Sequence, residues 1–249
     1  MKCAICFSGD IRTFNKCYPT FVKHIISPLK KNNIEYDIFC HFWKNSDNNN
    51  VIQTLKPKKY LEENQFHFVL PNFCKGMRFY TGKFNKIEKY ISYNILQYYG
   101  INRSFSLPDN SYNLAIRLRY DDYFNEDISI NELNSGNIWV GNGHLFLLNG
   151  IPTNINDSYA FGTFEQMHKY SLYYNYIPQL LKIIKDKKLP EKYKYFYNAI
   201  VLTQLFRYYL FEHAKLEPKY TKQKYGLYRN NGNITYYNDN IYCYKGNIY

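Results

Sequence analysis

The stretch NLAIRLRYDDYF, residues 113–124, is the feature from which the fold is best inferred. It has the apolar content of a buried strand, yet Arg117, Arg119 and Asp121 stand at alternate positions in it. Because side chains alternate between the two faces of a strand, we expect these three to share one face while the apolar residues between them bury the other. Two guanidinium groups and a carboxylate in such a strand need partners.

Two carboxylates, Asp121 and Asp122, stand where this predicted strand ends. In an open α/β sheet, ligands bind outside the carboxyl ends of the strands. Arginine binds phosphate oxygens in bidentate fashion and a carboxylate holds Mg²⁺ or Mn²⁺, so a phosphate with a divalent metal would satisfy the set. The alternative is an internal ladder of arginine–aspartate ion pairs.

The chain has 249 residues and a formal net charge of +12. The length predicts a single domain, and the charge predicts an anionic partner such as a nucleotide, a nucleic acid or an acidic membrane surface. The basic residues are scattered, so we do not expect a nucleic acid. The sequence has no apolar run of about eighteen residues and no signal-peptide pattern, which predicts a cytoplasmic protein and leaves peripheral membrane contact open.

Six cysteines fall at no metal-ligand spacing, and only Cys3 and Cys6 form a CxxC pair. Both lie in an apolar strand pattern, where positions three apart face opposite sides, so neither a shared zinc ion nor a redox turn is expected. We expect buried free thiols.

The N-terminal half alternates strand and helix patterns. We predict strands at residues 2–7, 36–43 and 65–70, helices at 17–29 and 86–99, and a helix cap at Gly100, all before the strand at 113–124. This alternation predicts an α/β fold with a Rossmann-type, mostly parallel sheet flanked by helices. Beyond it we predict short strands at 138–140 and 144–148, helices at 163–187, broken at Pro178, and at 193–213, and a hairpin at Asn231-Gly232.

Two loops are predicted to meet at the carboxyl edge of this sheet. SGDIRT, residues 8–13, follows the first strand, so its backbone N–H groups and Arg12 would meet a diphosphate, unless it is an ordinary tight turn. YDIFCHFWK, residues 36–44, brings His41 and Trp43 to the same edge, on the same face as Asp37. These two rings would hold a base or ribose, the alternative being core packing and a satisfied histidine.

The segment NDSYAFGTFEQM, residues 156–167, supplies Asp157 ahead of a helix. The same segment contains Glu165. If Asp121 holds a metal, a second carboxylate across the pocket would be the natural general base for an acceptor hydroxyl, although Asp157 could instead be a helix cap. His144 and His213 are further candidates for a metal ligand or an acid–base group, although structural roles are commoner for a lone histidine.

In this order, the four segments SGDIRT, YDIFCHFW, IRLRYDD and NDSYAFG resemble a family of GT-A type glycosyltransferases found in bacterial surface-polysaccharide clusters and large DNA viruses. The resemblance implies a nucleotide-sugar donor, with UDP-sugar favoured, a Mn²⁺ or Mg²⁺ ion, and sugar transfer to a hydroxyl of a glycan, glycoprotein or glycolipid. It implies a GT-A-like domain over 1–249, with a nucleotide-sugar-binding half at 1–122 and a helical acceptor-side half at 123–249.

The resemblance also implies roles for individual residues. The donor-binding positions are matched by Ser8, Gly9, Arg12, Asp37, His41, Trp43, Arg117 and Arg119. Asp121, with Asp122 beside it, matches the metal-binding carboxylate, in an Arg-x-Arg-x-Asp form instead of Asp-x-Asp. Asp157 matches the acidic residue of the late loop, with an acceptor-side or base role.

Two other functions remain open from the sequence. A nucleotidyltransferase also uses metal and carboxylates at a sheet edge, although it normally clusters more carboxylates for two metals. A non-catalytic nucleic-acid-binding protein would exploit the positive charge, and its binding would weaken steeply as salt rises.

Overall fold

The computed structural model describes residues 1–45, 47–79, 87–141, 145–148, 151–152, 155–197, 200–229, 232–236 and 241–243. Its centre is a seven-stranded sheet in the order β10-β6-β9-β4-β1-β2-β3. The strands of this sheet are β1 (Lys2–Gly9), β2 (Glu35–Trp43), β3 (Lys59–Glu63), β4 (Leu114–Leu118), β6 (Trp139–Val140), β9 (Ala160–Thr163) and β10 (Lys219–Tyr220). Neighbouring strands pair in parallel except around β9, which is antiparallel to β4 and β6.

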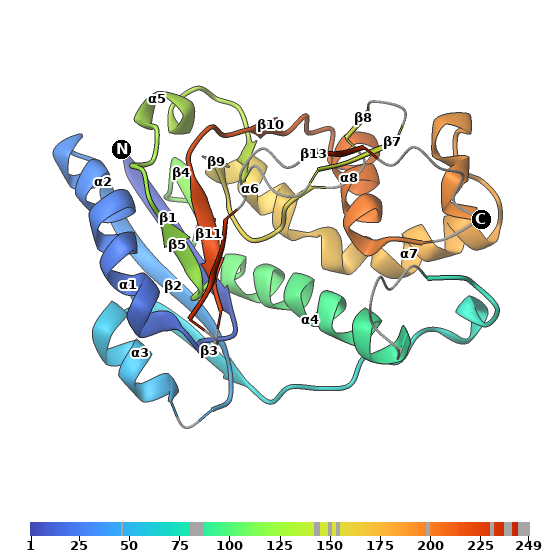
Figure 1. Ribbon diagram of the computed structural model, residues 1–249, viewed down its shortest axis with the longest axis horizontal. Helices are drawn as coiled ribbons and strands as arrows, with labels where there is room; N and C mark the ends of the chain where they lie inside the picture. Colours follow the sequence, from blue (N-terminus) through green and yellow to red (C-terminus); the bar gives the residue numbers. More distant parts are fainter. Residues whose placement is uncertain are drawn as a thin grey trace.

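Helices cover both faces of the sheet (Figure 1). One side carries α1 (Phe14–Phe21), a π-helical turn (Val22–Ile26), α2 (Ser27–Lys31) and α3 (Asn48–Leu55). The other carries α4 (Ile87–Phe105), α6 (Phe164–Ser171), α7 (Tyr173–Lys185) and α8 (Leu202–Glu212). The predicted α/β class, with a mostly parallel sheet flanked by helices and a helical C-terminal part, is confirmed.

The two faces of the sheet follow from the period-two pattern of its strands. In β1, Cys3, Ile5 and Phe7 pack in the cluster under α1–α3, whereas Ala4 and Cys6 pack in the cluster under α4 and α6–α8. All five are at most 3% exposed, as burial on both faces of a parallel sheet requires. Cys3 and Cys6 therefore face opposite sides, as predicted, and the five cysteines with described side chains are buried free thiols.

The chain leaves β1 for β2 and β3 on one side and then returns through α4 to β4 on the other. The strand order reverses between β1 and β4, which makes their carboxyl ends the switch point where open α/β sheets bind ligands. Gly9 ends β1 and Leu118 ends β4. The loops that follow these two residues therefore lie where a ligand is expected.

The strand predicted at 113–124 is wrong beyond Leu118. The chain turns at residues 119–121 and resumes as β5 (Asp122–Phe124), which pairs with β11 (Tyr225–Tyr228) outside the main sheet. The turn is closed by Asp122, whose Oδ2 accepts the backbone N–H of Arg119 at 2.7 Å. Arg119 and Asp121 therefore lie past the strand end and do not continue the face that carries Arg117.

The third strand is Lys59–Glu63 and not the predicted 65–70. It is an edge strand with mostly exposed side chains, so it needs no apolar run to be stable, and its charged sequence reads as a loop. The apolar residues at 65–70 instead pack irregularly, with Phe68 and Leu70 against the α4-side cluster.

Several helix boundaries also differ from the prediction. Gly100 does not cap α4 but lies inside it, where a Cβ would come within 3.2 Å of His41 Nδ1 and 3.3 Å of Ser8 Cβ. Pro178 lies inside α7, and the break falls at Leu172. The helix predicted at 193–213 is a 3₁₀ helix (Glu191–Tyr197) followed by α8.

Smaller elements complete the described chain. They are a 3₁₀ turn (Asn72–Cys74), α5 (Ile130–Leu133), β7 (Leu145–Leu148), β8 (Ile151–Pro152), β12 (Ile234–Tyr236) and β13 (Ile241–Cys243). β11 and β12 form the predicted hairpin, with Gly232 at φ +83° between them, while Asn231 lies outside the described residues.

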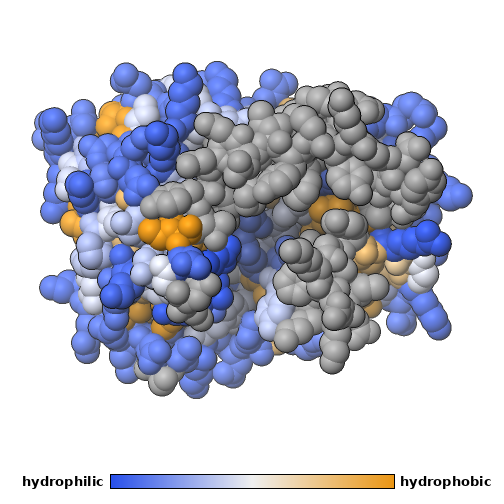
Figure 2. Space-filling view, in the orientation of Figure 1, coloured by the Kyte–Doolittle hydropathy of each residue, from blue (hydrophilic) through white to orange (hydrophobic). Residues whose placement is uncertain are grey.

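Hydrophilic residues dominate the described part of the face seen in Figure 2, and hydrophobic residues there form small separate groups. Among the described helices, none combines the length and apolar character needed to cross a membrane.

Candidate functional site

Three charged side chains converge at the β1–β4 switch point. Arg119 holds Asp121 with two hydrogen bonds, from Nε to Oδ1 at 2.7 Å and from NH2 to Oδ2 at 3.0 Å. Arg12, from the loop after β1, donates from NH2 to the same Oδ2 at 3.1 Å. The structure therefore brings together three residues that the sequence placed at this edge. They meet through arginine–aspartate ion pairs, which the sequence offered as the alternative to a phosphate with a divalent metal.

Asp121 stays ionised in this setting. Burial alone would raise the pKa of its fully buried carboxyl, but Arg119 and Arg12 outweigh burial and lower that pKa below its usual range. The two arginines are more exposed, at 33% of the side chain for Arg12 and 13% for Arg119. The carboxylate thus lies behind the guanidinium groups and not in front of them.

A cleft of about 560 Å³ opens beside these arginines. Gly9, Arg12, Trp43 and Arg119 contribute to its wall, whereas Asp121 does not. Gly9 has φ +125°, a conformation that disfavours any side chain, so the backbone is bare where β1 ends. A ligand in this cleft would meet guanidinium N–H groups, backbone and aromatic rings.

The aromatic side of the cleft is built around Trp43. Its ring stacks on Tyr99 at 5.7 Å between centroids and meets Phe66 edge-on at 6.1 Å. Tyr93, from α4, is half-exposed and also lines the cleft. Trp43 is therefore held in a rigid orientation at the wall, as base or sugar stacking requires.

Sequence reasoning missed several residues of this wall. They are Asp10, Ile11, Lys44, Asn45, Gln65, Tyr93, Leu96 and Gln97. Gln97 accepts from Arg119 NH1 at 3.0 Å and so helps to orient that guanidinium. Tyr93 and Gln97 are four residues apart on one face of the predicted helix, which was the available signal.

Asp122 and Arg117 are buried behind the cleft wall. Asp122 is 2% exposed. Burial is the main cause that raises its pKa well above the usual range, and repulsion from the neighbouring Asp121 adds to it. Arg117 is fully buried and donates from NH1 to the backbone oxygens of Ser8 and Leu118. Its Nε and NH2 have no hydrogen-bond partner among the described residues.

Arg117 therefore holds the carboxyl ends of β1 and β4 together from within, and burial lowers its pKa. Ser8 is 1% exposed and does not reach the cleft with its side chain. The structure thus assigns Ser8 and Arg117 to the support of the edge and not to its solvent-facing surface.

His41 is a buried structural histidine. It is fully buried, its Nε2 lies 3.0 Å from Glu63 Oε2, and its ring meets Trp43 edge-on at 4.7 Å. Burial lowers its pKa from 6.5 to about 4, although Glu63 acts in the opposite direction. Of the two alternatives from the sequence, a structural histidine fits better: Nε2 has Glu63 as its partner, Nδ1 has no hydrogen-bond partner among the described residues, and the ring packs against Trp43.

The lowered pKa of His41 predicts a pH-dependent stability. Between about pH 6.5 and pH 4 the unfolded chain binds a proton at this histidine that the folded chain does not, so stability rises with pH through that window. We expect the unfolding free energy to fall by about 3 kcal/mol from pH 7 to pH 4 through this group alone. Urea unfolding of the wild type and His41→Phe at both pH values measures it. An equal loss in both proteins would contradict the assignment.

Asp37 does not belong to this site, which corrects the sequence-based placement. It lies near the start of β2, pairs in register with Ala4, and binds Lys2 and Lys58, each at 2.9 Å, at the amino end of the strands. Alternation along β2 correctly put Asp37 on the face of His41, but the strand is long enough to carry the two to opposite ends.

Asp157 lies on the chain just before β9, at the carboxyl edge of β4, because Ala160 pairs in register with Arg117. It is half-buried. Burial raises its pKa, and Arg119 and Arg117 are close enough to oppose that rise. It is not the cap of α6, which begins with a capping box formed by Thr163 and Gln166.

The loop of Asp157 is anchored on both sides. Asn156 Oδ1 accepts from the backbone N–H and the hydroxyl of Ser158 at 2.9 and 2.7 Å, and Asn156 Nδ2 donates to the Tyr225 hydroxyl. Of the two histidine candidates, His213 packs among tyrosines of the C-terminal helices and His144 lies outside the described residues.

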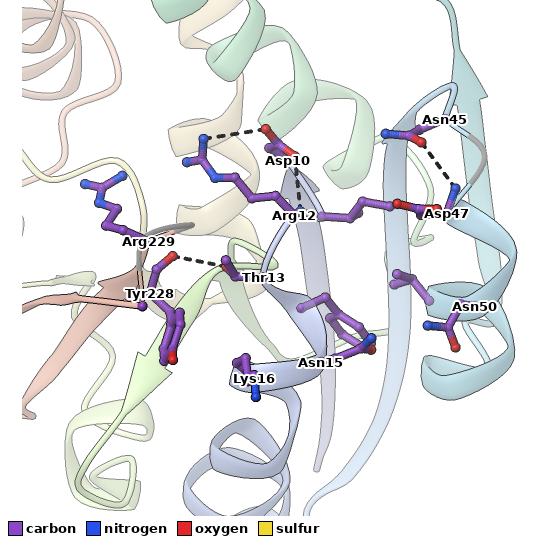
Figure 3. Close-up of a pocket in the computed structure, with 14 residues that line it drawn as sticks. Asp10, Arg12, Thr13, Asn15, Lys16, Asn45, Asp47, Asn50, Tyr228 and Arg229 are labelled. Carbon is purple, nitrogen blue, oxygen red and sulfur yellow. Dashed lines mark hydrogen bonds and ion pairs between the residues drawn. The ribbon is translucent and has the colours of Figure 1, made fainter.

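A second cleft of about 850 Å³ lies on the α1 and α3 side of the same edge and shares Arg12 with the first. Figure 3 shows its polar wall, with Tyr228 and Arg229 on one side and Asn45, Asp47 and Asn50 on the other. Arg12 is tied to Asp10 here, through its backbone N–H at 3.1 Å and an ion pair at 3.6 Å. Thr13 donates to the Tyr228 carbonyl at 3.1 Å.

Asp121 and Asp122, the two carboxylates predicted to bind a divalent metal, do not fit one. Both oxygens of Asp121 already accept guanidinium hydrogen bonds, and Asp122 is buried with a raised pKa. A cation placed before them would face two guanidinium groups. In the part of the chain that the structure describes, no three His, Cys, Asp or Glu residues cluster to hold a metal.

No protein-family model matches the sequence, and no curated protein matches it. Among solved structures, the chain is similar to the crystal structure of mouse xyloside xylosyltransferase 1 in its apo form. The sequences are 11% identical, the match covers 88% of this chain and 84% of that one, and the TM-score is 0.44.

Proposed function

We propose that this protein is a glycosyltransferase that moves a sugar from a nucleotide-diphosphate sugar, with UDP-sugar favoured, to a hydroxyl of a glycan, glycoprotein or glycolipid. The observation that carries the proposal is the pair Arg12 and Arg119, which line one cleft at the switch point of the sheet. Guanidinium groups match phosphate oxygens in bidentate geometry, and aromatic rings beside them suit a base or a sugar. The four sequence segments that resemble GT-A enzymes support the same reading.

Five residues of the cleft have a role in this proposal. Trp43 and Tyr93 hold the nucleoside. Because Gly9 has no side chain, the nucleoside can approach the end of β1 closely. Arg12 and Arg119 hold the diphosphate. As the bond from the sugar to the diphosphate breaks, negative charge develops on the leaving group, and the two guanidinium groups stabilise it.

Asp157 is the proposed general base. Its raised pKa brings it closer to neutral pH, where a carboxylate removes a proton from a hydroxyl more effectively. It would take the proton of the acceptor hydroxyl as that oxygen attacks the sugar. The proposed reaction does not use the Mn²⁺ or Mg²⁺ ion expected from the sequence, because Asp121 and Asp122 do not fit a divalent metal.

We propose further that the chain acts as one domain. Strands β6, β9 and β10, which follow residue 122, complete the sheet begun by β1–β4. In this reading residues 1–122 bind the donor, while residues 123–249 supply Asp157 and the acceptor side.

The two alternative functions are less well supported by the geometry. A two-metal nucleotidyltransferase needs open carboxylates, whereas Asp121 is paired with arginines and Asp122 is buried. For a nucleic-acid-binding protein, a continuous basic surface would be expected, whereas several of the described lysines pair with carboxylates.

A thermal-shift screen against UDP-, GDP-, CDP- and dTDP-sugars tests the proposal. A ligand that binds only the folded protein raises Tm, and at about 100 times its Kd it adds about 2.7 kcal/mol of stability. We expect a shift with one nucleotide, UDP favoured, that is absent in Trp43→Ala. No shift with any nucleotide, beside a salt-sensitive shift with DNA or RNA, would support the binding-protein alternative.

A further inference from the structure

In the cluster of Arg12, Arg119 and Asp121, the two arginines face a cleft and the aspartate is buried behind them. Arg12 and Arg119 line the cleft beside Trp43, while Asp121 is fully buried and lines neither described cleft. The carboxylate binds both arginines through three hydrogen bonds of 2.7 to 3.1 Å. A ligand that enters the cleft therefore meets the two guanidinium groups before it could reach the Asp121 carboxylate.

The charges of this cluster favour a bound anion. The two guanidinium groups share the buried Asp121 carboxylate. Asp10 also lines this cleft, but it is 55% exposed and its Oδ2 lies 3.6 Å from Arg12 NH1, so solvent screens that pair and it neutralises Arg12 only weakly. Gln97 fixes a further N–H group of Arg119 through its NH1, so that guanidinium is held on two sides. Groups fixed in this way bind a phosphate without first losing side-chain entropy.

The same arrangement leaves a divalent cation few ligands. Asp10 lines the cleft, but its Oδ1 accepts the backbone N–H of Arg12 and its Oδ2 pairs with the guanidinium of Arg12. An ionised carboxylate offers about four lone-pair positions, and the arginines occupy three on Asp121. To reach Asp121, a metal would have to displace both guanidinium groups. Asp122 offers no substitute, because its side chain is buried and its Oδ2 accepts the backbone N–H of Arg119.

We propose, resting on the proposed function, that Arg12 and Arg119 bind the donor diphosphate directly and without a divalent metal, with Asp121 as the positioning residue that orients both. Arg12 and Arg119 occupy the place that a metal ion would take in neutralising the leaving group. Among the described residues, the hydrogen bonds of the Asp121 carboxylate go to the two arginines, and Asp121 lines neither cleft, so it acts through Arg12 and Arg119.

Calorimetric titration of the purified protein with UDP tests this directly, in buffer with Mn²⁺ and in buffer with EDTA. We expect the two Kd values to agree within about threefold, because no bridging metal contributes to binding. A Kd more than about tenfold weaker in EDTA would overturn the inference and leave the proposed function intact. If neither UDP, GDP, CDP nor dTDP binds in either buffer, the proposed function fails and the inference with it.

Single-residue variants provide a second, independent measurement. Arg12→Gln and Arg119→Gln should each weaken UDP binding by about tenfold or more, a typical effect of losing a charge-assisted hydrogen bond, and Mn²⁺ should not restore it. Arg207→Gln, on α8 and away from both clefts, removes the same charge and should change Kd less than about threefold. Wild-type affinity in both cleft variants would overturn the inference.

Arg119 is largely buried, so its variant could lose stability as well as binding. Arg12 is a third exposed, and its removal leaves Asp121 paired with Arg119. The Arg12→Gln result therefore decides the matter if Arg119→Gln does not fold, as judged by circular dichroism and Tm.

Discussion

Replacement of Asp121 with alanine is expected to lower kcat/KM for sugar transfer by about 100-fold or more, the effect of losing one preorganised electrostatic element. The substitution leaves Arg12 and Arg119 without the carboxylate that orients them. The guanidinium groups would then repel each other and move apart, so they would no longer fit the diphosphate of the leaving group. Steady-state kinetics with the nucleotide-sugar found by thermal shift measures the loss.

The companion variant Asp121→Asn separates orientation from charge. The amide retains one oxygen that can accept from Arg119 but loses the negative charge, so we expect an intermediate loss. Asp37→Asn is the matched control, because Asp37 binds Lys2 and Lys58 at the far end of the strands and should leave kcat/KM unchanged. Near-normal turnover of Asp121→Ala would contradict any role for Asp121 at the site.

Replacement of Asp157 with asparagine is expected to reduce kcat by about 10² to 10⁴-fold, the usual contribution of a positioned general base. The amide cannot take the proton of the acceptor hydroxyl. Donor binding should change little, because Arg12, Arg119 and Trp43 remain in place. Asp127→Asn, an exposed aspartate that pairs with His24, is the matched control and should keep full activity.

The pH dependence of the wild type gives a second measure of the same residue. A base works only when deprotonated, and burial raises the pKa of Asp157, so activity should fall on the acid side at a pH above the usual carboxyl range. Asp157→Asn should lose this acidic limb. A loss below about tenfold in kcat would instead assign the base to another group, as in transfer that retains the sugar configuration.

The local pattern of the sequence predicted the central strands well. The apolar pattern located β1 and β2 within one or two residues of their observed bounds, because strands that are buried on both faces, or nearly so, have near-continuous apolar runs. It failed at β3, where an exposed edge strand carries lysine and glutamate and leaves no apolar signal. It also extended the strand at 113–124 through a tight turn, since Arg119 and Asp121 continue the alternation by residue type.

The sequence predicted which charged residues form the candidate site, but it did not predict which of them are buried and which face the cleft. That Arg12, Arg119 and Asp121 would meet follows from the rule that strand ends share an edge. Which of them would face the cleft depends on how the turn after Leu118 folds, and no local pattern encodes that. The sequence also grouped Asp37 with His41 because the two share a face of β2, although they lie at opposite ends of that strand, and it predicted a cap at Gly100, which lies inside α4.

The sequence by itself determined the α/β class, the two-sided burial of the sheet and the set of charged side chains at its carboxyl edge, because residue type and spacing set which faces are buried. Only the tertiary structure decided that Asp121 lies behind Arg12 and Arg119, that His41 supports Trp43, and that Arg117 is enclosed. Burial and charge pairing depend on contacts between residues more than a hundred positions apart, such as Arg12 and Asp121, and these exist only once the sheet has formed.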